Sequence, residues 1–328
     1  MNSRTYNWGF VAAGAMAHAM ARDLALLPNA RIHSVYSRTA ESALDFARSF
    51  SGCKTYSSLE ALVSDGEVDI VYISSPNHLH LPHARAALET GKPVLCEKPF
   101  TLNAAQLSEL IEIARVKQLF LMEAMWIRWL PIVVKMRQLL TEQIIGDLRL
   151  LKAGFHAQLP MNPEGRIYNL AMGGGSLLDL GIYPISFASL VFSQQPEEMA
   201  SIAHLGTTGI DEHFGAVFHY SKIRMALLSA GVDGAFRDDI SVHGSAGSIR
   251  MEKPWKLGRL TIEPRDGDSE TVTLPMEGGG YGYQAAEVMR CLDAGLLESP
   301  VMPLDESLQI MQTSDRLRRQ WELIFPGE

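Results

Sequence analysis

The first third of the sequence repeats one pattern: a short apolar segment, a few small or polar residues, and then a segment with helical spacing of apolar residues. The apolar segments fall at residues 8–13, 31–36, 54–56, 68–73 and 94–96. Strands that alternate with helices at this spacing form right-handed β-α-β units, in which the strands are parallel. We therefore predict a doubly wound parallel sheet of the Rossmann type, and ligands of such sheets bind at the carboxyl ends of the strands.

The turn after the first strand carries Ala12, Gly14 and Ala17 in the arrangement Ala-x-Gly-x-x-Ala. Small residues at these positions let the backbone approach a pyrophosphate, which binds the free N–H groups at the start of the next helix. Alanine replaces the usual first glycine, so this turn alone fits a plain strand-to-helix connection equally well. The predicted cofactor-binding residues of the turn are Ala12, Gly14, Ala15 and Met16.

The second strand ends in Ser37-Arg38-Thr39, about where the residue that binds the adenosine ribose belongs. An acidic side chain there would bind both ribose hydroxyls and favour NAD, whereas a hydroxyl followed by an arginine accommodates a 2′-phosphate. We predict that Ser37 and Arg38 bind this phosphate and that the cofactor is NADP, with NAD possible. The alternative is a surface arginine after a strand.

Two further strands also end in polar residues. One opens into Ser74-Ser75-Pro76-Asn77-His78-Leu79-His80, and the other delivers Glu97-Lys98-Pro99 beyond the edge of the sheet. Gly14, Ser37, Ser74 and Lys98 all follow strands of one parallel sheet, so their four loops are expected to converge on one crevice. A solvated Glu97-Lys98 pair at an ordinary loop is the alternative for the last of them.

Beyond residue 146 the pattern changes to short alternating segments, at residues 148–155, 212–220, 223–230, 239–242, 248–251, 260–263 and 271–274. This alternation predicts an antiparallel sheet. We expect an α/β Rossmann domain at residues 1–124 and an α+β domain with a large, mostly antiparallel open sheet at residues 125–328. An open sheet of this size exposes one face, so a homodimer packed sheet to sheet is expected.

Asp179 and Tyr183 follow a run of three glycines and are four residues apart, so in a helix they project from one face. Pro184 suits the first turn of a following helix at residues 185–192, which would place the pair at a helix junction. The alternative for Tyr183 is a half-buried aromatic side chain whose hydroxyl donates to a backbone carbonyl.

Together these motifs resemble the glucose-fructose oxidoreductase/inositol dehydrogenase (Gfo/Idh/MocA) family. The segment Met122-Glu123-Ala124-Met125-Trp126-Ile127-Arg128 and the ending Glu298-Ser299-Pro300-Val301-Met302-Pro303-Leu304 are similar to those of its dimeric dihydrodiol dehydrogenase and NADP-dependent D-xylose dehydrogenase branch. The resemblance covers nearly the whole chain. It implies an NADP-dependent oxidoreductase that moves hydride between nicotinamide and a secondary alcohol or hemiacetal carbon of an aldose such as D-xylose or of a trans-dihydrodiol.

The resemblance also implies roles for single residues. The lysine of Glu-Lys-Pro, here Lys98, is catalytic in the family, and a loop like that at residues 74–80 lies along the cofactor. Tyrosine at position 183 is typical of the dihydrodiol branch, whereas many relatives carry histidine. The further cofactor-binding residues implied are Ser74, Ser75, Pro76, Asn77, His80, Glu97, Lys98, Trp126 and Arg128.

Oxidation of a secondary alcohol needs a base for the hydroxyl proton while hydride leaves the same carbon. Free tyrosine, with a pKa of about 10, is a poor base at neutral pH, but a nearby ammonium stabilises the phenolate and lowers that pKa. We predict that Tyr183 transfers the proton, that Lys98 gives electrostatic support and binds the substrate hydroxyl, and that Asp179 orients lysine and substrate. The predicted substrate-binding residues are Trp126, Phe155, Trp255 and Tyr281, because flat apolar walls suit a sugar C–H face or an arene diol ring.

Composition excludes several other classes. The net charge of −8 argues against general nucleic-acid binding, and no uninterrupted apolar run reaches the roughly 18 residues that a spanning helix needs. Cys53, Cys96 and Cys291 show neither metal spacing nor a disulfide framework, and a cytoplasmic location is expected. His78 and His80 have no carboxylate or cysteine at ligand spacing, so no metal site is predicted.

Two other functions stay open at this point. One is a non-catalytic NAD(P)-bound sensor of the same fold, against which the presence of Lys98, Asp179 and Tyr183 together argues. The other is a biliverdin-reductase-like or imine-reducing enzyme, which would need a different proton donor.

Overall fold

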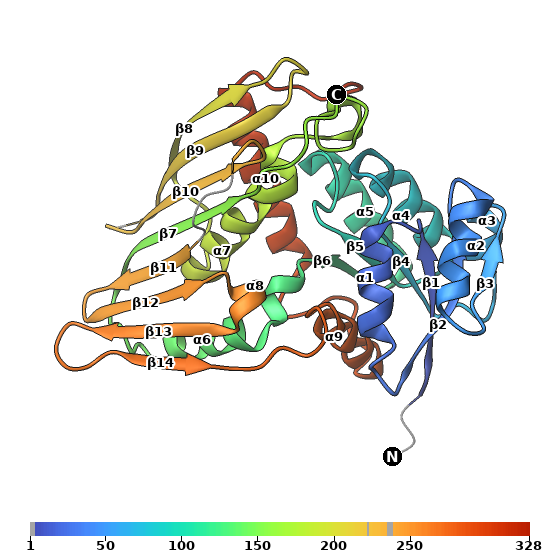
Figure 1. Cartoon of the computed structure of the whole chain (residues 1–328), viewed down its shortest axis with the longest axis horizontal. Coiled ribbons are helices and arrows are strands. Elements are labelled where there is room, and N and C mark those ends of the chain that lie inside the picture. The colour runs from blue at the N-terminus through green and yellow to red at the C-terminus, as the bar shows by residue number, and fades with distance from the viewer. Residues whose placement is uncertain (1–3, 222, 235–238) are drawn as a thin grey trace. The chain divides into compact units, whose positions relative to one another are not determined.

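The computed structural model describes residues 4–221, 223–234 and 239–328, and these divide into two compact units (Figure 1). Unit 1 comprises Met1–Thr101, Ala105–Trp126 and Glu277–Ser307. Unit 2 comprises Leu102–Ala104, Ile127–Met276 and Leu308–Glu328. The predicted division at residues 124/125 therefore differs from the observed one mainly in the segment Glu277–Ser307, which belongs to unit 1.

Unit 1 is built on a six-stranded sheet in the order β3-β2-β1-β4-β5-β6, and all its strand pairs are parallel. Its strands are β1 (Tyr6–Val11), β2 (Ala30–Tyr36), β3 (Lys54–Tyr56), β4 (Ile70–Ile73), β5 (Val94–Glu97) and β6 (Leu121–Ala124). The strand order reverses between β1 and β4, which is the place where doubly wound sheets bind ligands. The predicted Rossmann sheet is confirmed.

The helices of unit 1 are α1 (Ala15–Leu24), α2 (Ala40–Ser49), α3 (Leu59–Val63), η1 (Asn77–Leu79), α4 (His80–Glu89), most of α5 (Ala104–Lys117) and α9 (Gly282–Asp293). The hydroxyls of Thr39 and Ser58 cap α2 and α3 by accepting backbone N–H groups, which stabilises both helix starts. Helix α9 packs on α1, and the Tyr6 hydroxyl donates to Asp293 at the end of α9. These contacts explain why the late segment belongs with the N-terminal sheet.

Unit 2 contains an eight-stranded sheet in the order β14-β13-β12-β11-β7-β10-β9-β8. Its strands are β7 (Leu148–His156), β8 (Glu198–Leu205), β9 (Asp211–His219), β10 (Met225–Gly231), β11 (Asp239–Gly244), β12 (Gly247–Glu252), β13 (Arg259–Pro264) and β14 (Glu270–Thr273). Only the β7–β10 pair is parallel among these strands, so the predicted mostly antiparallel open sheet is confirmed. Strand β8 was not predicted, because Ile202 and Leu205 are exposed and give it a weak alternation.

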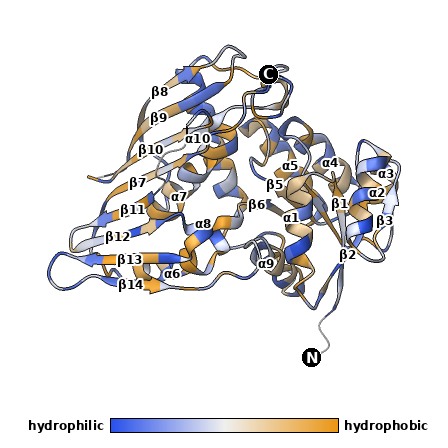
Figure 2. Cartoon of the chain, viewed as in Figure 1, coloured by the Kyte–Doolittle hydropathy of each residue, from blue (hydrophilic) through white to orange (hydrophobic). Residues whose placement is uncertain are grey.

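The remaining helical segments are η2 (Trp126–Trp129), α6 (Pro131–Thr141), η3 (Leu170–Met172), the π-helical turn η4 (Leu177–Gly181), α7 (Ile182–Phe192), α8 (Pro254–Leu257) and α10 (Leu304–Gln320). Helix α7 packs on β7 and β10, and α6 packs on β13. On β9 the inward residues Phe214, Ala216 and Phe218 are buried, whereas Gly215 and Val217 between them are exposed. Figure 2 shows hydrophobic and hydrophilic residues mixed along these strands, as one buried face and one open face require.

One helical stretch, Leu170–Phe192, is long and apolar enough to cross a membrane by length and composition alone. Of its most apolar 18 residues, 83% are buried inside the structure. This stretch therefore serves as a core helix of unit 2, and it includes the turn that carries Asp179 and Tyr183.

Candidate active site

The turn between β1 and α1 presents unobstructed backbone. Ala12 has a φ of +80°, the left-handed conformation that glycine normally supplies at this point, and its N–H donates to the Tyr36 carbonyl at 2.8 Å. Gly14 precedes α1, and a Cβ placed on it would meet no atom of the described chain within 4 Å. The first turn of α1, which includes Ala15 and Met16, has no acidic residue and no side-chain cap. These features fit a bound pyrophosphate, because the helix N-terminus offers free N–H groups without a competing carboxylate.

The end of β2 presents Ser37 and Arg38 at the neighbouring position. Arg38 is exposed and makes no hydrogen bond or ion pair with any residue within 4–221, 223–234 or 239–328. Thr39 is committed to the cap of α2, where it accepts from the Ser42 N–H at 3.3 Å. Ser37 and Arg38 thus remain available to an anionic ligand at this edge of the sheet.

The loop after β4 is fastened to the loop after β5 by His80. The buried His80 ring lies 2.8 Å from the Ser75 carbonyl through Nε2 and 2.7 Å from the Pro99 carbonyl through Nδ1. Burial lowers the pKa of His80 to about 4, so the ring is neutral at pH 7 and donates from only one nitrogen. His80 therefore holds the two loops together, and its predicted cofactor contact stays a prediction.

The remaining residues of that loop lie close to β1. The Ser74 N–H donates to the Val11 carbonyl at 3.0 Å, and the Ser75 hydroxyl lies 3.0 Å from Nδ1 of His83. Pro76 precedes η1, which begins at Asn77. The loop at residues 74–77 thus follows β4 directly beside the end of β1, as the predicted convergence requires.

Strand β5 ends at the buried Glu97, which accepts a 2.6 Å hydrogen bond from the Tyr72 hydroxyl of β4. Burial and the charge of Glu97 raise the pKa of Tyr72 well above its ordinary value, so Tyr72 stays a hydrogen-bond donor. Lys98 is partly exposed and precedes Pro99 through a cis peptide bond. The strand end therefore holds Glu97 inside unit 1 and brings Lys98 out at the carboxyl edge of the sheet.

Trp126 and Tyr281 lie together in unit 1, with ring centroids 4.6 Å apart. The loop before α9, which carries Tyr281, is held by Asp23 near the end of α1. This buried carboxylate accepts N–H groups from Gly279 at 2.8 Å and from Tyr281 at 2.6 Å. Asp23 thereby fixes the backbone of Tyr281. It lies near the C-terminal end of α1, whereas the predicted pyrophosphate site lies at the N-terminal end of the same helix.

Arg128 is buried in unit 2, although it was predicted to bind the cofactor. Its Nε donates to the Ser186 hydroxyl and its Nη2 to the Ser186 carbonyl, both at 3.0 Å. These bonds tie the segment after Trp126 to helix α7. Arg128 therefore has a structural role, and its predicted cofactor contact stays a prediction.

Asp179 and Tyr183 lie on one continuous helical segment that changes type between them. Asp179 belongs to the π-helical turn η4, and Tyr183 lies in the first turn of α7, which begins at Ile182 and not at residue 185. Single π-helical turns are rare and occur frequently at functional sites. This change of helix type is the helix junction that we predicted from Pro184. It lies nearer the N-terminus than predicted, because α7 begins at Ile182.

The Tyr183 ring stacks on Phe155 of β7, with centroids 5.1 Å apart and an interplanar angle of 23°. Trp255 of α8 lies on Phe155 in turn, at 4.6 Å. Tyr183 and Trp255 are partly exposed, whereas Phe155 is buried. Three of the predicted site residues thus form one aromatic row in unit 2, built from β7, α7 and α8.

Arg166 is a residue that the sequence did not single out. Its guanidinium donates to Oδ1 of Asp179 at 2.8 Å, while the Arg166 side chain is half exposed and the Asp179 side chain is 10% exposed. Arg166 lies in the irregular segment between β7 and η3, where no periodicity marks it. The ion pair means that Asp179 has a basic partner within unit 2.

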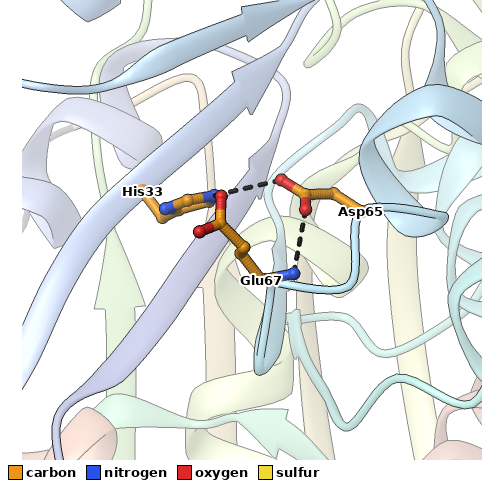
Figure 3. A group of neighbouring side chains, drawn as sticks. All are labelled: His33, Asp65 and Glu67. Carbon is orange, nitrogen blue, oxygen red and sulfur yellow. Dashed lines mark hydrogen bonds and ion pairs between the residues drawn. The ribbon is translucent and has the colours of Figure 1, made fainter.

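A second group of titratable residues lies elsewhere in unit 1. His33, Asp65 and Glu67 place one ligand atom each within 4.8 Å of one another, and Figure 3 shows the His33 ring and Asp65 pointing toward one another. Tyr56 donates to Asp65 at 2.7 Å, and Lys54 pairs with Glu67. Protein donors thus already satisfy both carboxylates, so the group is an internal network that joins β2, β3 and the loop before β4.

Comparison with known proteins places the chain. Residues 6–125 match the model of an oxidoreductase family with an NAD-binding Rossmann fold, GFO_IDH_MocA, and residues 133–250 match the GFO/IDH/MocA C-terminal domain. The chain belongs to the Gfo/Idh/MocA oxidoreductase family. The predicted family, enzyme class and nicotinamide cofactor are confirmed, while the roles of single site residues stay predictions.

Members of this family similar to the chain act on diols and sugars, according to their names. A trans-1,2-dihydrobenzene-1,2-diol dehydrogenase of Mus musculus is 34% identical over 98% of both chains. A D-xylose 1-dehydrogenase (NADP(+)) of Hypocrea jecorina is 32% identical over 99% of this chain and 94% of its own length. The crystal structure of a 3-ketoreductase from Actinomadura kijaniata, in complex with NADP and TDP-benzene, has a TM-score of 0.85 at 27% identity and covers 96% and 98% of the two chains.

Proposed function

We propose that this family member is an NADP-dependent dehydrogenase that oxidises a CH–OH carbon of a small aldose or a trans-dihydrodiol. The observation that carries the proposal is the aromatic row in unit 2, which presents the Tyr183 phenol beside the flat rings of Phe155 and Trp255. The names of the relatives, diol dehydrogenases and a xylose dehydrogenase, support this substrate class.

Residues of unit 1 are proposed to hold the cofactor. The N–H groups at the start of α1 bind its pyrophosphate, and Ser37 and Arg38 bind the 2′-phosphate that distinguishes NADP from NAD. The bound nicotinamide accepts the hydride in the oxidation direction and returns it in the reduction direction. The guanidinium of Arg38 is exposed and pairs with none of the described residues, which supports the preference for NADP.

Tyr183 is proposed to take the hydroxyl proton of the alcohol at its phenolic oxygen. Lys98 keeps the role predicted from the sequence, which is electrostatic support of the phenolate and a hydrogen bond to the substrate hydroxyl. Asp179 orients these groups, and its pairing with Arg166 at 2.8 Å fixes the carboxylate in one position. The aromatic faces of Phe155, Trp255, Trp126 and Tyr281 bind the apolar face of the substrate.

Formation of reduced nicotinamide tests this proposal directly. Purified protein is given NADP, or NAD separately, with a panel of pentoses, hexoses and arene trans-dihydrodiols, and absorbance of the reduced cofactor is followed. We expect turnover with NADP on a pentose or a dihydrodiol. Silence across the whole panel, with NADP still bound, would contradict the proposed substrate class.

We further propose that two copies associate through the open face of the sheet of unit 2. Outward positions of β8, β9 and β10 are apolar: Ile202 is 83% exposed, Leu227 39% and Val217 38%. Leu227 and Val217 are direct cross-strand neighbours, so they form one apolar patch. Outward positions of β12 and β13 carry ion pairs instead, such as that between Arg250 and Glu252 at 2.6 Å, so the patch covers one half of the face.

The mass of the protein in solution tests this association. We expect a dimer at micromolar concentration by light scattering or sedimentation, and a monomer after Leu227→Glu, because a buried unpaired carboxylate opposes association. A Thr261→Glu variant, on the polar half of the same face, serves as the matched control and keeps the dimer. A monomeric mass for the unaltered protein would contradict the proposal.

The proposed location is the cytoplasm. Cys53, Cys96 and Cys291 are free thiols, and burial raises the pKa of Cys53 to about 11 and of Cys291 to about 12. Such thiols stay protonated and unreactive at neutral pH. Fractionation of cells that express a tagged chain tests the location, and recovery of the chain in an oxidising compartment would contradict it.

A further inference from the structure

Asp211 opens strand β9 and is 1% exposed. Its Oδ2 accepts two hydrogen bonds, from the Ser176 hydroxyl at 2.7 Å and from the Leu177 N–H at 2.6 Å. Leu177 is the first residue of the turn η4, and the side chain of Ser176 does not cap it. A carboxylate 34 residues further along the chain therefore binds the start of the turn that carries Asp179.

The second oxygen of this carboxylate lies against bare backbone. Oδ1 of Asp211 has no hydrogen-bond partner among the described residues. It lies where a side chain of Gly175 would be, because a Cβ built on Gly175 would come within 2.1 Å of it. Gly175 also has a φ of +115°, a conformation that only glycine adopts without strain. Because Asp211 packs closely against Gly175, the start of the turn η4 has little freedom to shift.

One charged side chain acts on this carboxylate from another element. Burial raises the pKa of Asp211 to about 7, and the hydrogen bonds from Ser176 and Leu177, together with the charge of Arg318 on α10, oppose the rise. Arg318 itself pairs with Asp315 at 2.7 Å and with Glu328 at 2.6 Å. Protonation of Asp211 removes the negative charge that makes its hydrogen bonds to the turn strong.

We propose that Asp211 is a positioning residue for the reaction, which sets the orientation of Asp179 and Tyr183 by holding the start of the turn η4. The inference rests on the proposed roles of Asp179 and Tyr183. Only Leu178 separates Leu177 from Asp179, so a shift at the start of the turn moves the Asp179 carboxylate away from Arg166. An ordinary helix cap would come from the residue next to the helix, whereas here a distant buried carboxylate supplies it.

The Asp211→Asn variant tests the inference, because the amide keeps the shape and one acceptor oxygen but never carries a charge. With NADP and whichever of D-xylose and a trans-dihydrodiol supports turnover, we expect kcat at pH 8 to fall roughly 10-fold. The dissociation constant of NADP should not change. The unaltered enzyme should lose kcat as the pH falls through about 7, and this inflection should be missing in the variant.

Two further variants complete the experiment. Ser176→Ala removes one of the two donors to Asp211 and leaves the carboxylate in place. We expect kcat to fall less than in Asp211→Asn and the inflection near pH 7 to remain. If Asp211→Asn does not fold, the kcat of Ser176→Ala tests the positioning role. Asp147→Asn, an identical change on a side chain that is 80% exposed, should leave kcat and its pH profile as they are. A merely structural Asp211 would lower the melting temperature of Asp211→Asn without changing kcat or the pH profile.

The outcomes separate this inference from the proposed function. If Tyr183→Phe abolishes turnover while Asp211→Asn and Ser176→Ala keep the full rate and the inflection, the positioning role is overturned and the proposed mechanism stands. If Tyr183→Phe keeps the full rate, the proposed mechanism itself fails, and the positioning role fails with it.

Discussion

The two units assemble their functional groups in different ways. In unit 1 each group lies in the loop that follows a strand of one parallel sheet: Gly14 follows β1, Ser37 follows β2, Ser74 follows β4 and Lys98 follows β5. In unit 2 the aromatic row takes one residue from each of three elements, and Asp211 holds the turn η4 from a separate strand. Topology alone places the first set, whereas the second depends on long-range packing.

This difference predicts that variants of the two units will have different effects. Changes at the strand ends of unit 1 should alter cofactor binding or the chemistry at one loop and leave the fold intact. Changes around the turn η4 should disturb orientation and stability together, because buried contacts hold that turn.

The largest effect is expected for Lys98→Ala. Loss of the ammonium removes the proposed support of the phenolate, so kcat should fall at least 100-fold, within the range of general acid–base contributions. The dissociation constant of NADP should change by less than about threefold, since the pyrophosphate and adenosine contacts lie at other strand ends. Steady-state kinetics and cofactor titration measure the two quantities.

Lys117→Ala is the matched control for this change. Lys117 is an exposed lysine of unit 1 whose ammonium donates to the Glu89 carbonyl at 3.1 Å. Its removal should leave both kcat and cofactor affinity unchanged. A Lys98→Ala enzyme that turns over at the rate of this control would remove Lys98 from the mechanism.

Gly175→Ala should cost the most stability. The new Cβ would meet Oδ1 of Asp211 in a backbone conformation with a φ of +115°, so the free energy of unfolding should fall by roughly 3 kcal/mol or more. Urea unfolding measures the loss. Gly215→Ala on β9, where a Cβ would meet nothing within 4 Å, should stay within about 0.5 kcal/mol of the unaltered protein. Equal stability of the two variants would contradict the close packing around the turn.

The two units also differ in how far the sequence predicts them. The strands of unit 1 and the residues that follow them could be predicted, because a buried strand and the polar loop after it are both local features. The membership of Glu277–Ser307 in unit 1 could not, because it depends on α9 and on the hydrogen bonds that Asp23 accepts from residues about 256 positions away.

In unit 2 the sequence indicated four site residues: Asp179, Tyr183, Phe155 and Trp255. It did not indicate Arg166 and Asp211, whose contacts hold the turn η4 and Asp179 in place. Arg166 lies in a segment without periodicity, and its pairing with Asp179 is a tertiary contact. Asp211 is one acidic residue at the start of a strand, and nothing in its neighbours along the chain marks it as buried. Strand β8 was missed because Ile202 and Leu205 are exposed, at positions where alternation predicts polar residues.

The neutral His80 of unit 1 predicts an acid-sensitive contribution to stability. Its pKa of about 4 in the folded state lies below the ordinary value of 6.5, so the unfolded chain binds more protons between these values. Stability from this group is present above about pH 6.5 and is lost as the pH falls through 4. By pH 5 the loss should reach about 2 kcal/mol.

The His80→Gln variant isolates this contribution, because a glutamine amide can still donate to the Ser75 or Pro99 carbonyl but does not titrate. Urea unfolding at pH 7.5 and pH 5 should show a larger loss for the unaltered protein than for the variant. The same pH dependence in both proteins would mean that His80 does not stay neutral in the fold.

Cofactor choice is expected to depend on the Arg38 side chain. Arg38→Ala removes one charged contact, so the dissociation constant of NADP should rise about 10- to 100-fold, while that of NAD stays the same. Fluorescence titration measures both. Arg48→Ala, at an exposed arginine of α2 that pairs with Asp45 at 2.7 Å, is the control. Equal weakening of NADP and NAD would show that Arg38 does not bind the 2′-phosphate.

The proposed mechanism depends above all on proton transfer by Tyr183, and the Tyr183→Phe variant tests this role. The phenylalanine ring keeps the stacking on Phe155 and loses only the hydroxyl, and Tyr220→Phe, at a buried tyrosine of the same unit, controls for the loss of a phenol. The measurement is kcat together with the dissociation constant of NADP on the same preparation. We expect a kcat lowered at least 100-fold with unchanged NADP affinity. A near-normal kcat would contradict it.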